Sequence, residues 1–136
     1  MAEEAKLNLE VVSPERLIMS KSVDMVSVSG TEGDFGVLPG HTALVSSIRP
    51  GLLQIEVDKE VEKFFISGGF IEVMEDKISI LATAVISPND ISISDCEEKI
   101  IKFNEEIDAC ENELDKKPIL KSIDKYQAMI DFKNIN

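Results

Sequence analysis

The side chains that most often perform catalysis or bind metals are scarce in this chain of 136 residues. It has one histidine, His41, and two cysteines, Cys96 and Cys110. A zinc site needs several Cys or His ligands at suitable spacing, and a histidine-dependent nucleophile needs a base beside it. A lone histidine after Gly40, in a segment of turn residues, is typical of a structural or surface position. The sequence therefore predicts no catalytic centre, metal site or cofactor.

Two short stretches match fragments of catalytic motifs without their essential parts. Segment 36–42 has three residues between its glycines and a histidine in place of the lysine that a phosphate-binding loop requires. Asp34-Phe35-Gly36 matches a kinase tripeptide, but the other kinase motifs are missing. Acidic residues among glycines, here Glu32 and Asp34, usually occupy a solvated turn rather than act as general acid and base. We interpret both matches as coincidental.

The charge balance excludes whole classes of ligand. The chain has 14 lysine and arginine residues against 26 aspartate and glutamate residues, a formal charge of -12. Such a chain repels nucleic acid and acidic lipid at long range, so neither is expected as a direct partner. The hydrophobic fraction of 43% is ordinary for a globular protein and excludes disorder as the main state.

No segment has the composition of a membrane anchor. Even the run 78–86 is interrupted by polar residues, and a membrane span needs about 18 apolar ones. Residues 1–5 lack the pattern of a secretory signal or transit peptide. The two cysteines fit core thiols in a reducing compartment. We expect a cytosolic protein without direct lipid insertion.

Residues 1–87 have the pattern of a β domain. Apolar and polar residues alternate in 7–11, as in a strand with one buried face. All seven glycines fall between residues 30 and 69, and turn signals rich in Gly, Pro and Asp recur at short spacing. Many short strands of this kind predict a sandwich or a barrel.

Residues 88–136 instead have the pattern of two helices, with apolar positions three and four residues apart. Ser94 or Asp95 is expected to cap the first helix, and Lys116-Lys117-Pro118 to end it. The first stripe comprises Cys96, Ile100, Phe103, Ile107, Cys110 and Leu114, and the second comprises Ile119, Ile123, Tyr126 and Ile130. A helical hairpin appended to the β domain follows, and the whole predicts an interaction or regulatory protein.

Three blocks of sequence resemble a known family. Residues 32–45 read Glu-Gly-Asp-Phe-Gly-Val-Leu-Pro-Gly-His-Thr-Ala-Leu-Val, residues 48–51 read Ile-Arg-Pro-Gly, and residues 65–73 read Phe-Ile-Ser-Gly-Gly-Phe-Ile-Glu-Val. Together with the opening strand and the helical tail, they resemble the epsilon subunit of bacterial and plastid F-type ATP synthases, the counterpart of the mitochondrial delta subunit. The resemblance covers nearly the whole chain.

The resemblance implies a ten-stranded β-sandwich followed by an antiparallel two-helix hairpin. It implies a non-catalytic rotor component of the central stalk that couples ion flow through the c-ring to ATP synthesis or hydrolysis. The implied partners are the gamma subunit, the c-ring and, transiently through the hairpin, the alpha and beta subunits. The implied location is peripheral, on the cytoplasmic face of a bacterial cell membrane, or on the thylakoid if the protein is plastid-encoded.

The resemblance also assigns roles to individual residues. The turn Glu32-Gly33-Asp34 matches the family loop that touches the c-ring, and His41 and Thr42 match the stretch that faces gamma. The glycines expected to serve structural turns are Gly36, Gly40, Gly51, Gly68 and Gly69.

The tail departs from those family members that bind ATP. Their first helix opens with an Ile/Leu-Asp-x-x-Arg-Ala motif, in which Ser92 and Asp95 here replace the aspartate and the arginine. Lys121 and Lys125 are the nearby cations, so weak or no nucleotide binding is expected. Between Asp95 and Asp115 nine acidic residues stand against two lysines, which disfavours inhibition through contact with an acidic segment. The alternative to the rotor role is a free-standing β-sandwich interaction module with a helical oligomerisation tail.

Overall fold

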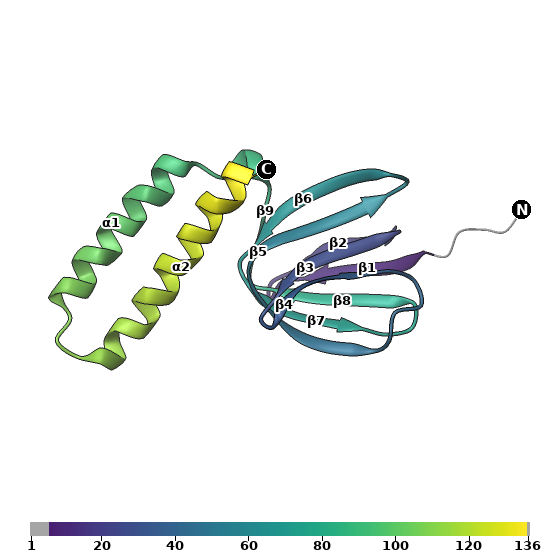
Figure 1. Ribbon diagram of the computed structural model, residues 1–136, viewed down its shortest axis with the longest axis horizontal. Coiled ribbons are helices and arrows are strands. Elements are labelled where there is room, and N and C mark those ends of the chain that lie inside the picture. Colours follow the sequence, from purple (N-terminus) through teal and green to yellow (C-terminus); the bar gives the residue numbers. More distant parts are fainter. Residues whose placement is uncertain (1–5, 136) are drawn as a thin grey trace, which may run out of the picture. The chain divides into compact units, whose positions relative to one another are not determined.

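The computed structural model describes residues 6–135. The chain divides into two compact units, and the boundary in the sequence falls between Ile86 and Ser87. Residues 1–5, on which the expected lack of a targeting signal rests, lie outside the described range, as does residue 136. The first unit contains β1 (Leu7–Val12), β2 (Leu17–Val23), β3 (Met25–Gly30), β4 (Gly33–Val37), β5 (Leu44–Val57), β6 (Glu60–Ile66), β7 (Gly69–Val73), β8 (Lys77–Ala82) and β9 (Val85–Ile86). The second contains the 3₁₀ turn η1 (Pro88–Asp90) and the helices α1 (Ile93–Ala109) and α2 (Glu113–Ile135) (Figure 1).

The strands of the first unit form two layers joined by β5. One layer has the order β2-β1-β8-β7 and ends on the first part of β5, which pairs with β7 up to Ile48. The other contains β4 and β3, the second part of β5 from Gly51 onward, and β6 and β9. Arg49 and Pro50 separate the two parts, and the proline, which lacks a backbone donor, allows the strand to change layers.

The predicted fold class, a β-sandwich followed by a two-helix hairpin, is confirmed. Within residues 6–135 the strands number nine, where the resemblance implies ten. The continuous 14-residue strand β5 serves as a strand in both layers, which accounts for the lower count.

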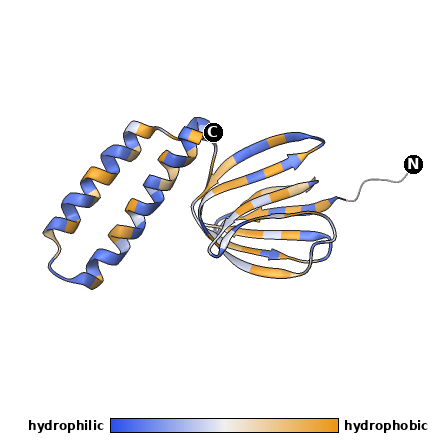
Figure 2. Ribbon diagram, viewed as in Figure 1, coloured by the Kyte–Doolittle hydropathy of each residue, from blue (hydrophilic) through white to orange (hydrophobic). Residues whose placement is uncertain are grey.

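The core of the sandwich follows from the alternation of apolar and polar residues. In β1, Leu7, Leu9 and Val11 are fully buried while Asn8 is exposed, β8 has a similar alternation, and Figure 2 shows apolar and polar residues interspersed along the strands. Each such side chain contributes about 1.5–3 kcal/mol when it leaves water. The cluster that fills the space between the layers comprises Leu7, Leu9, Val11, Val23, Val26, Val28, Val37, Ile48, Leu53, Ile55, Ile66, Ile71, Val73, Ile78, Ile80 and Ala82.

The hairpin of the second unit turns earlier than the sequence predicted. The predicted stop at Lys116-Lys117-Pro118 is wrong, because α1 ends at Ala109 and Pro118 lies inside α2. The side chain of Asn112 accepts a hydrogen bond from the N–H of Leu114 at 2.9 Å and so caps α2. Pro118 is the sixth residue of α2, beyond the first turn in which proline is favoured, so α2 continues through it without one backbone hydrogen bond.

The start of α1 also differs from expectation. Neither Ser94 nor Asp95 is the N-cap, since Ser92 holds that position and its hydroxyl accepts a hydrogen bond from the N–H of Asp95 at 3.4 Å. Phe103 of α1 and Tyr126 of α2 stack with ring centroids 5.9 Å apart, which joins the two predicted stripes. No helix among the described residues is long and apolar enough to cross a bilayer.

Candidate functional site

The predicted c-ring turn lies at the tip of the β3–β4 hairpin. Gly30 pairs with Gly33, so Thr31 and Glu32 form the turn, and Glu32, Gly33 and Asp34 are all exposed. The N–H of Thr31 donates to the carbonyl of Ser47 at 3.2 Å, which ties the tip to β5. Thus the three residues assigned by resemblance project together from one end of the sandwich.

The predicted gamma-facing residues lie at the other end of β4. The N–H of His41 donates to the carbonyl of Leu38 at 3.1 Å, closing a tight turn in which Gly40 has a φ of 82°. Nδ1 of His41 lies 2.7 Å from the carbonyl oxygen of Thr42, and Thr42 itself is exposed. At about 3.3 Å per residue, the length of β4 separates this segment from the β3–β4 turn. The structure therefore does not bring the two sets of candidate residues together.

A third surface, which the sequence analysis missed, is an exposed apolar face on one layer. Val45 of β5, Phe70 of β7 and Leu81 of β8 are 70%, 55% and 51% exposed. Phe70 and Leu81 are directly paired, and a hollow of about 280 Å³ is lined by these three residues and Val12, with Glu72 and Ser79 as its polar members. We call Val45, Phe70, Leu81 and Val12 the apolar face. The sequence contains a signal for this face, because successive residues of a strand point to opposite faces of the sheet. Two apolar neighbours, such as Phe70 and Ile71, therefore place one apolar side chain on the outer face.

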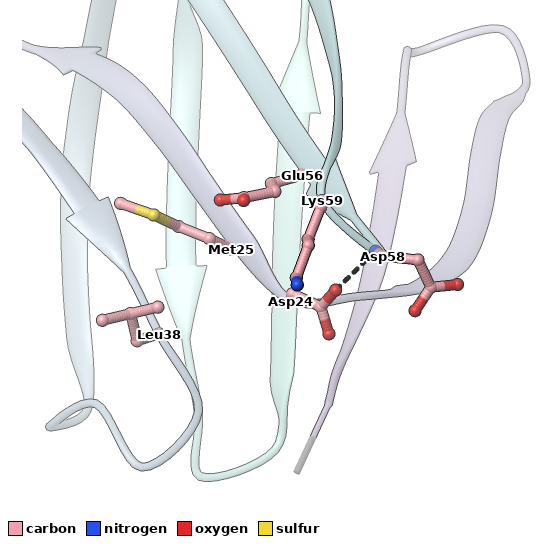
Figure 3. Close-up of a pocket in the computed structure, with 6 residues that line it drawn as sticks. All are labelled: Asp24, Met25, Leu38, Glu56, Asp58 and Lys59. Atoms are coloured by element: carbon pink, nitrogen blue, oxygen red, sulfur yellow. Dashed lines mark hydrogen bonds between the residues drawn. The ribbon is translucent and has the colours of Figure 1, made fainter. Parts of the chain in front are cut away.

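An ionic cluster surrounds a shallow hollow of about 370 Å³ in the same unit (Figure 3). Asp58 and Lys59 form its β5–β6 turn with φ angles of 51° and 69°, and the N–H of Asp58 donates to Asp24 at 2.6 Å. Nζ of Lys6 lies 2.9 Å from Asp58 and 3.4 Å from Asp24. The hydrogen bond to Asp58, assisted by Asp24, raises the pKa of Lys6 above its ordinary value. These contacts join the start of β1 to two turns, but because Asp58 is largely exposed the ion pairs contribute little to stability.

The five glycines assigned to turns divide into two groups. Gly36 lies inside β4 and Gly51 inside β5, so these two are strand glycines rather than turn glycines. A Cβ on Gly51 would lie 2.7 Å from Oγ of Ser29, which explains the absence of a side chain there. Gly40, Gly68 and Gly69 have positive φ, the backbone region that favours glycine.

The helical unit holds the thiols and the replaced nucleotide motif. Burial raises the pKa of the Cys96 thiol, and the carboxylates of Asp95 and Glu97 raise it further, so the group stays protonated at neutral pH. Nζ of Lys125 lies 4.9 Å from the centre of the Tyr126 ring, in a cation–π contact. No group of three or more Cys, His, Asp or Glu side chains in residues 6–135 is arranged to hold a metal.

Comparison with known proteins identifies the family. Residues 6–88 match the model of the ATP synthase delta/epsilon chain β-sandwich domain. The ATP synthase epsilon chain of Maricaulis maris is 38% identical over 124 residues, which cover 91% of this chain and 93% of the relative. That of Desulforudis audaxviator is 43% identical over 94 residues, or 69% of each chain.

A solved structure shares the fold. It is a chain of the Euglena gracilis mitochondrial ATP synthase, from a complex of OSCP, F1 and c-ring, and it aligns with a TM-score of 0.81 over 95% of this chain and 82% of its own length, at 19% identity. At that identity the likeness shows the fold alone. The assignment to a family rests on the matching family model and on the relatives that are more similar in sequence. The resemblance read from the three sequence blocks is confirmed, and the chain belongs to the family of ATP synthase epsilon chains.

Proposed function

We propose that this chain is a non-catalytic rotor component of the central stalk, which couples ion flow through the c-ring to ATP turnover in the catalytic head. Family membership supports the proposal, and the observation that carries it is the apolar face. A sandwich that exposes Val45, Phe70 and Leu81 on adjacent strands has a surface suited to burial against another protein.

The partner of the apolar face is, in this proposal, the gamma subunit. Val45 follows shortly after the segment His41-Thr42 that the family resemblance assigns to gamma, so the two form one continuous stretch of chain. The β3–β4 turn contacts the c-ring through Glu32, Gly33 and Asp34. Protein contacts alone then hold the chain at the cytoplasmic face of the membrane, or at the thylakoid if it is plastid-encoded.

The packing of the sandwich suits a part that transmits torque. A close-packed interior deforms little under load, and the residues of the core cluster are nearly all inaccessible to solvent. The continuous strand β5 adds a covalent connection between the layers, so a force applied at one layer passes to the other through the backbone. The domain thereby acts as a rigid body between two partners.

For the hairpin we propose a regulatory role that depends little on charge. The helix α1 carries six acidic residues against two lysines, three fewer acids than predicted, because Glu111 lies between the helices and Glu113 and Asp115 belong to α2. This helix would still be repelled by an acidic segment. Exposed apolar residues such as Ile101, Leu114 and Leu120 offer the alternative, docking through apolar contacts with the alpha and beta subunits.

The rotor role is tested by adding the chain to a bacterial ATP synthase depleted of its epsilon subunit. We expect the full chain to bind and to restore coupling between ATP turnover and ion pumping. A chain ending at Asn89 keeps the whole core cluster, and we expect it to restore coupling with ATPase activity within about twofold of the full chain.

The outcomes separate the candidate functions. Lack of binding to the gamma-containing complex, with unchanged ATPase activity, would instead support the free-standing interaction module. A large rise in ATPase activity on truncation would show that the hairpin inhibits strongly, and would contradict the small effect expected from its removal.

We also expect the hairpin not to hold ATP. The acidic residue Asp95 lies in the first turn of α1, and Lys125 is engaged with Tyr126, so little positive charge faces a phosphate. Equilibrium dialysis should give a Kd above about 1 mM. As a matched control, the double variant Ser92→Asp/Asp95→Arg restores the aspartate and the arginine of the family motif and should bind at least about tenfold more tightly. Tight, specific binding by the unaltered chain would contradict this expectation.

A further inference from the structure

We propose that Arg49 is a positioning residue for the β3–β4 turn, and that it engages Asp34 so that Glu32 is the carboxylate left to meet the partner. The inference rests on the proposed function for the identity of that partner. The contacts themselves belong to the isolated sandwich. It assigns different tasks to two acidic residues that the family resemblance treats alike.

Arg49 holds both strands of the hairpin at once. Its Nε–H donates to the carbonyl of Gly30, the last residue of β3, at 3.2 Å. Its Nη2 donates to the carboxylate of Asp34 in β4 and forms an ion pair with it. One planar guanidinium therefore spans the two strands just below the turn.

The hairpin needs such a support because β4 is an edge strand. Among the described strands, β4 pairs with β3 and with no other. A two-stranded ribbon twists more readily than a strand inside a sheet, and the turn closes at Gly33, whose φ of 135° suits glycine alone. β3 is tied to β5 near the tip by the pairing of Gly30 with Ile48 and by the Thr31–Ser47 hydrogen bond, and Arg49 adds the side-chain contact that reaches across to β4.

Arg49 is itself held in place by the backbone. It directly precedes Pro50, at the point where β5 changes layers, and a residue before proline is confined to extended conformations. The backbone conformation of Arg49 is thus restricted, and the planar guanidinium donates in fixed directions to two acceptors, the carbonyl of Gly30 and the carboxylate of Asp34. A lysine has a single ammonium group on a flexible stem and cannot reproduce both directional contacts.

This arrangement gives the two carboxylates of the turn different electrostatic surroundings. Asp34 is neutralised locally by Arg49, whereas the side chain of Glu32 is exposed and has no ion pair or hydrogen bond within residues 6–135. A partner approaching the tip meets one uncompensated carboxylate on a braced turn. Specific polar recognition of this kind favours a partner loop that offers a cation or several hydrogen-bond donors.

The first test measures the turn in the isolated full-length chain. Arg49→Gln should speed amide hydrogen exchange at Thr31 by about three- to fivefold, since an exposed ion pair is lost, and Arg49→Lys should restore only part of the protection. The matched control is Lys63→Gln, which removes an exposed cation from β6 and should leave Thr31 unchanged. Equal exchange in Arg49→Gln and the unaltered chain would overturn the proposal.

The second test measures binding to ATP synthase depleted of its epsilon subunit. Arg49→Gln should weaken binding at least as much as Asp34→Asn, and the double variant should be no weaker than Arg49→Gln alone, because both single variants break the same ion pair. Glu32→Gln should weaken binding and also reduce its dependence on salt, whereas the double variant Arg49→Gln/Asp34→Asn, which removes a balanced pair of charges, should leave that dependence unchanged.

Additive effects of Arg49→Gln and Asp34→Asn, or a salt dependence that the double variant changes as much as Glu32→Gln does, would refute the division of tasks. The binding test and the hydrogen-exchange test contradict different proposals when they fail. If the unaltered chain did not bind the complex, the proposed function would be wrong, while hydrogen exchange would still decide whether Arg49 braces the turn.

Discussion

Replacing Gly69 by alanine is expected to destabilise the sandwich by about 3–5 kcal/mol, most of the stability of a small domain. Gly69 has a φ of 146°, and a Cβ built on it would lie 2.0 Å from the carbonyl oxygen of Leu81. The strand cannot shift to make room, because Gly69 pairs with Ile48 on one side and with Ala82 on the other. The backbone strain at this φ angle and the overlap of the Cβ with Leu81 therefore both contribute to the loss of stability. Urea unfolding followed by circular dichroism measures the loss.

Gly40→Ala is the matched control for backbone conformation alone. Gly40 also has positive φ, but a Cβ on it would meet no atom within 4 Å. We expect a cost of about 1 kcal/mol, the ordinary penalty for an L residue in that region. If Gly69→Ala cost no more than Gly40→Ala, the contact with Leu81 would not be what excludes a side chain at position 69.

Replacing Phe70 by aspartate is expected to weaken association with the epsilon-depleted synthase by about 30-fold or more. Phe70 lies in the apolar face, paired with Leu81 across β7 and β8, and aromatic side chains at the centre of an interface contribute about 2 kcal/mol or more. An aspartate there would bury a charge among apolar groups when the partner docks. The binding constant, measured with the full-length chain, checks the prediction.

The stability of the same variant separates binding from folding. Phe70 is 55% exposed, so Phe70→Asp should lower the free energy of unfolding by only about 1–2 kcal/mol, through the lost pairing with Leu81 and the low β propensity of aspartate, and the sandwich should stay folded. Val61→Asp is the matched control, since Val61 is 48% exposed on β6 and outside the apolar face. Comparable binding by the unaltered chain, Phe70→Asp and Val61→Asp would mean that the apolar face does not contact the synthase.

Much of this architecture was predictable because its signals are local. Alternation in Leu7, Leu9 and Val11 places one face of β1 in the core, and the repeat of three and four residues predicts both helices. Turn-forming residues end the strands at short intervals. The contiguous blocks that carry the family resemblance could likewise be read along the chain. Each of these features depends on neighbours in the sequence, so the sequence by itself determined the fold class and the family.

Boundaries and glycine roles were less predictable. Pro118 is typical of the end of one helix and the start of another, but Asn112 caps α2 earlier, and α2 continues through the proline although one backbone donor is missing there. Gly36 and Gly51 looked like turn residues because glycine usually marks turns. In the structure Gly51 leaves room for Ser29, a neighbour distant in the sequence.

The tertiary structure alone decided what the surfaces present. It pairs β1 in parallel with β8, collects Val45, Phe70 and Leu81 on one exposed face, and places Arg49 across Gly30 and Asp34. These relations join residues far apart in the chain. Periodicity shows that a strand has a face to bury, but it does not show which strand lies beside it or which face remains exposed once the layers have packed. That choice belongs to strand pairing, and here it determines the candidate contacts with the rest of the synthase.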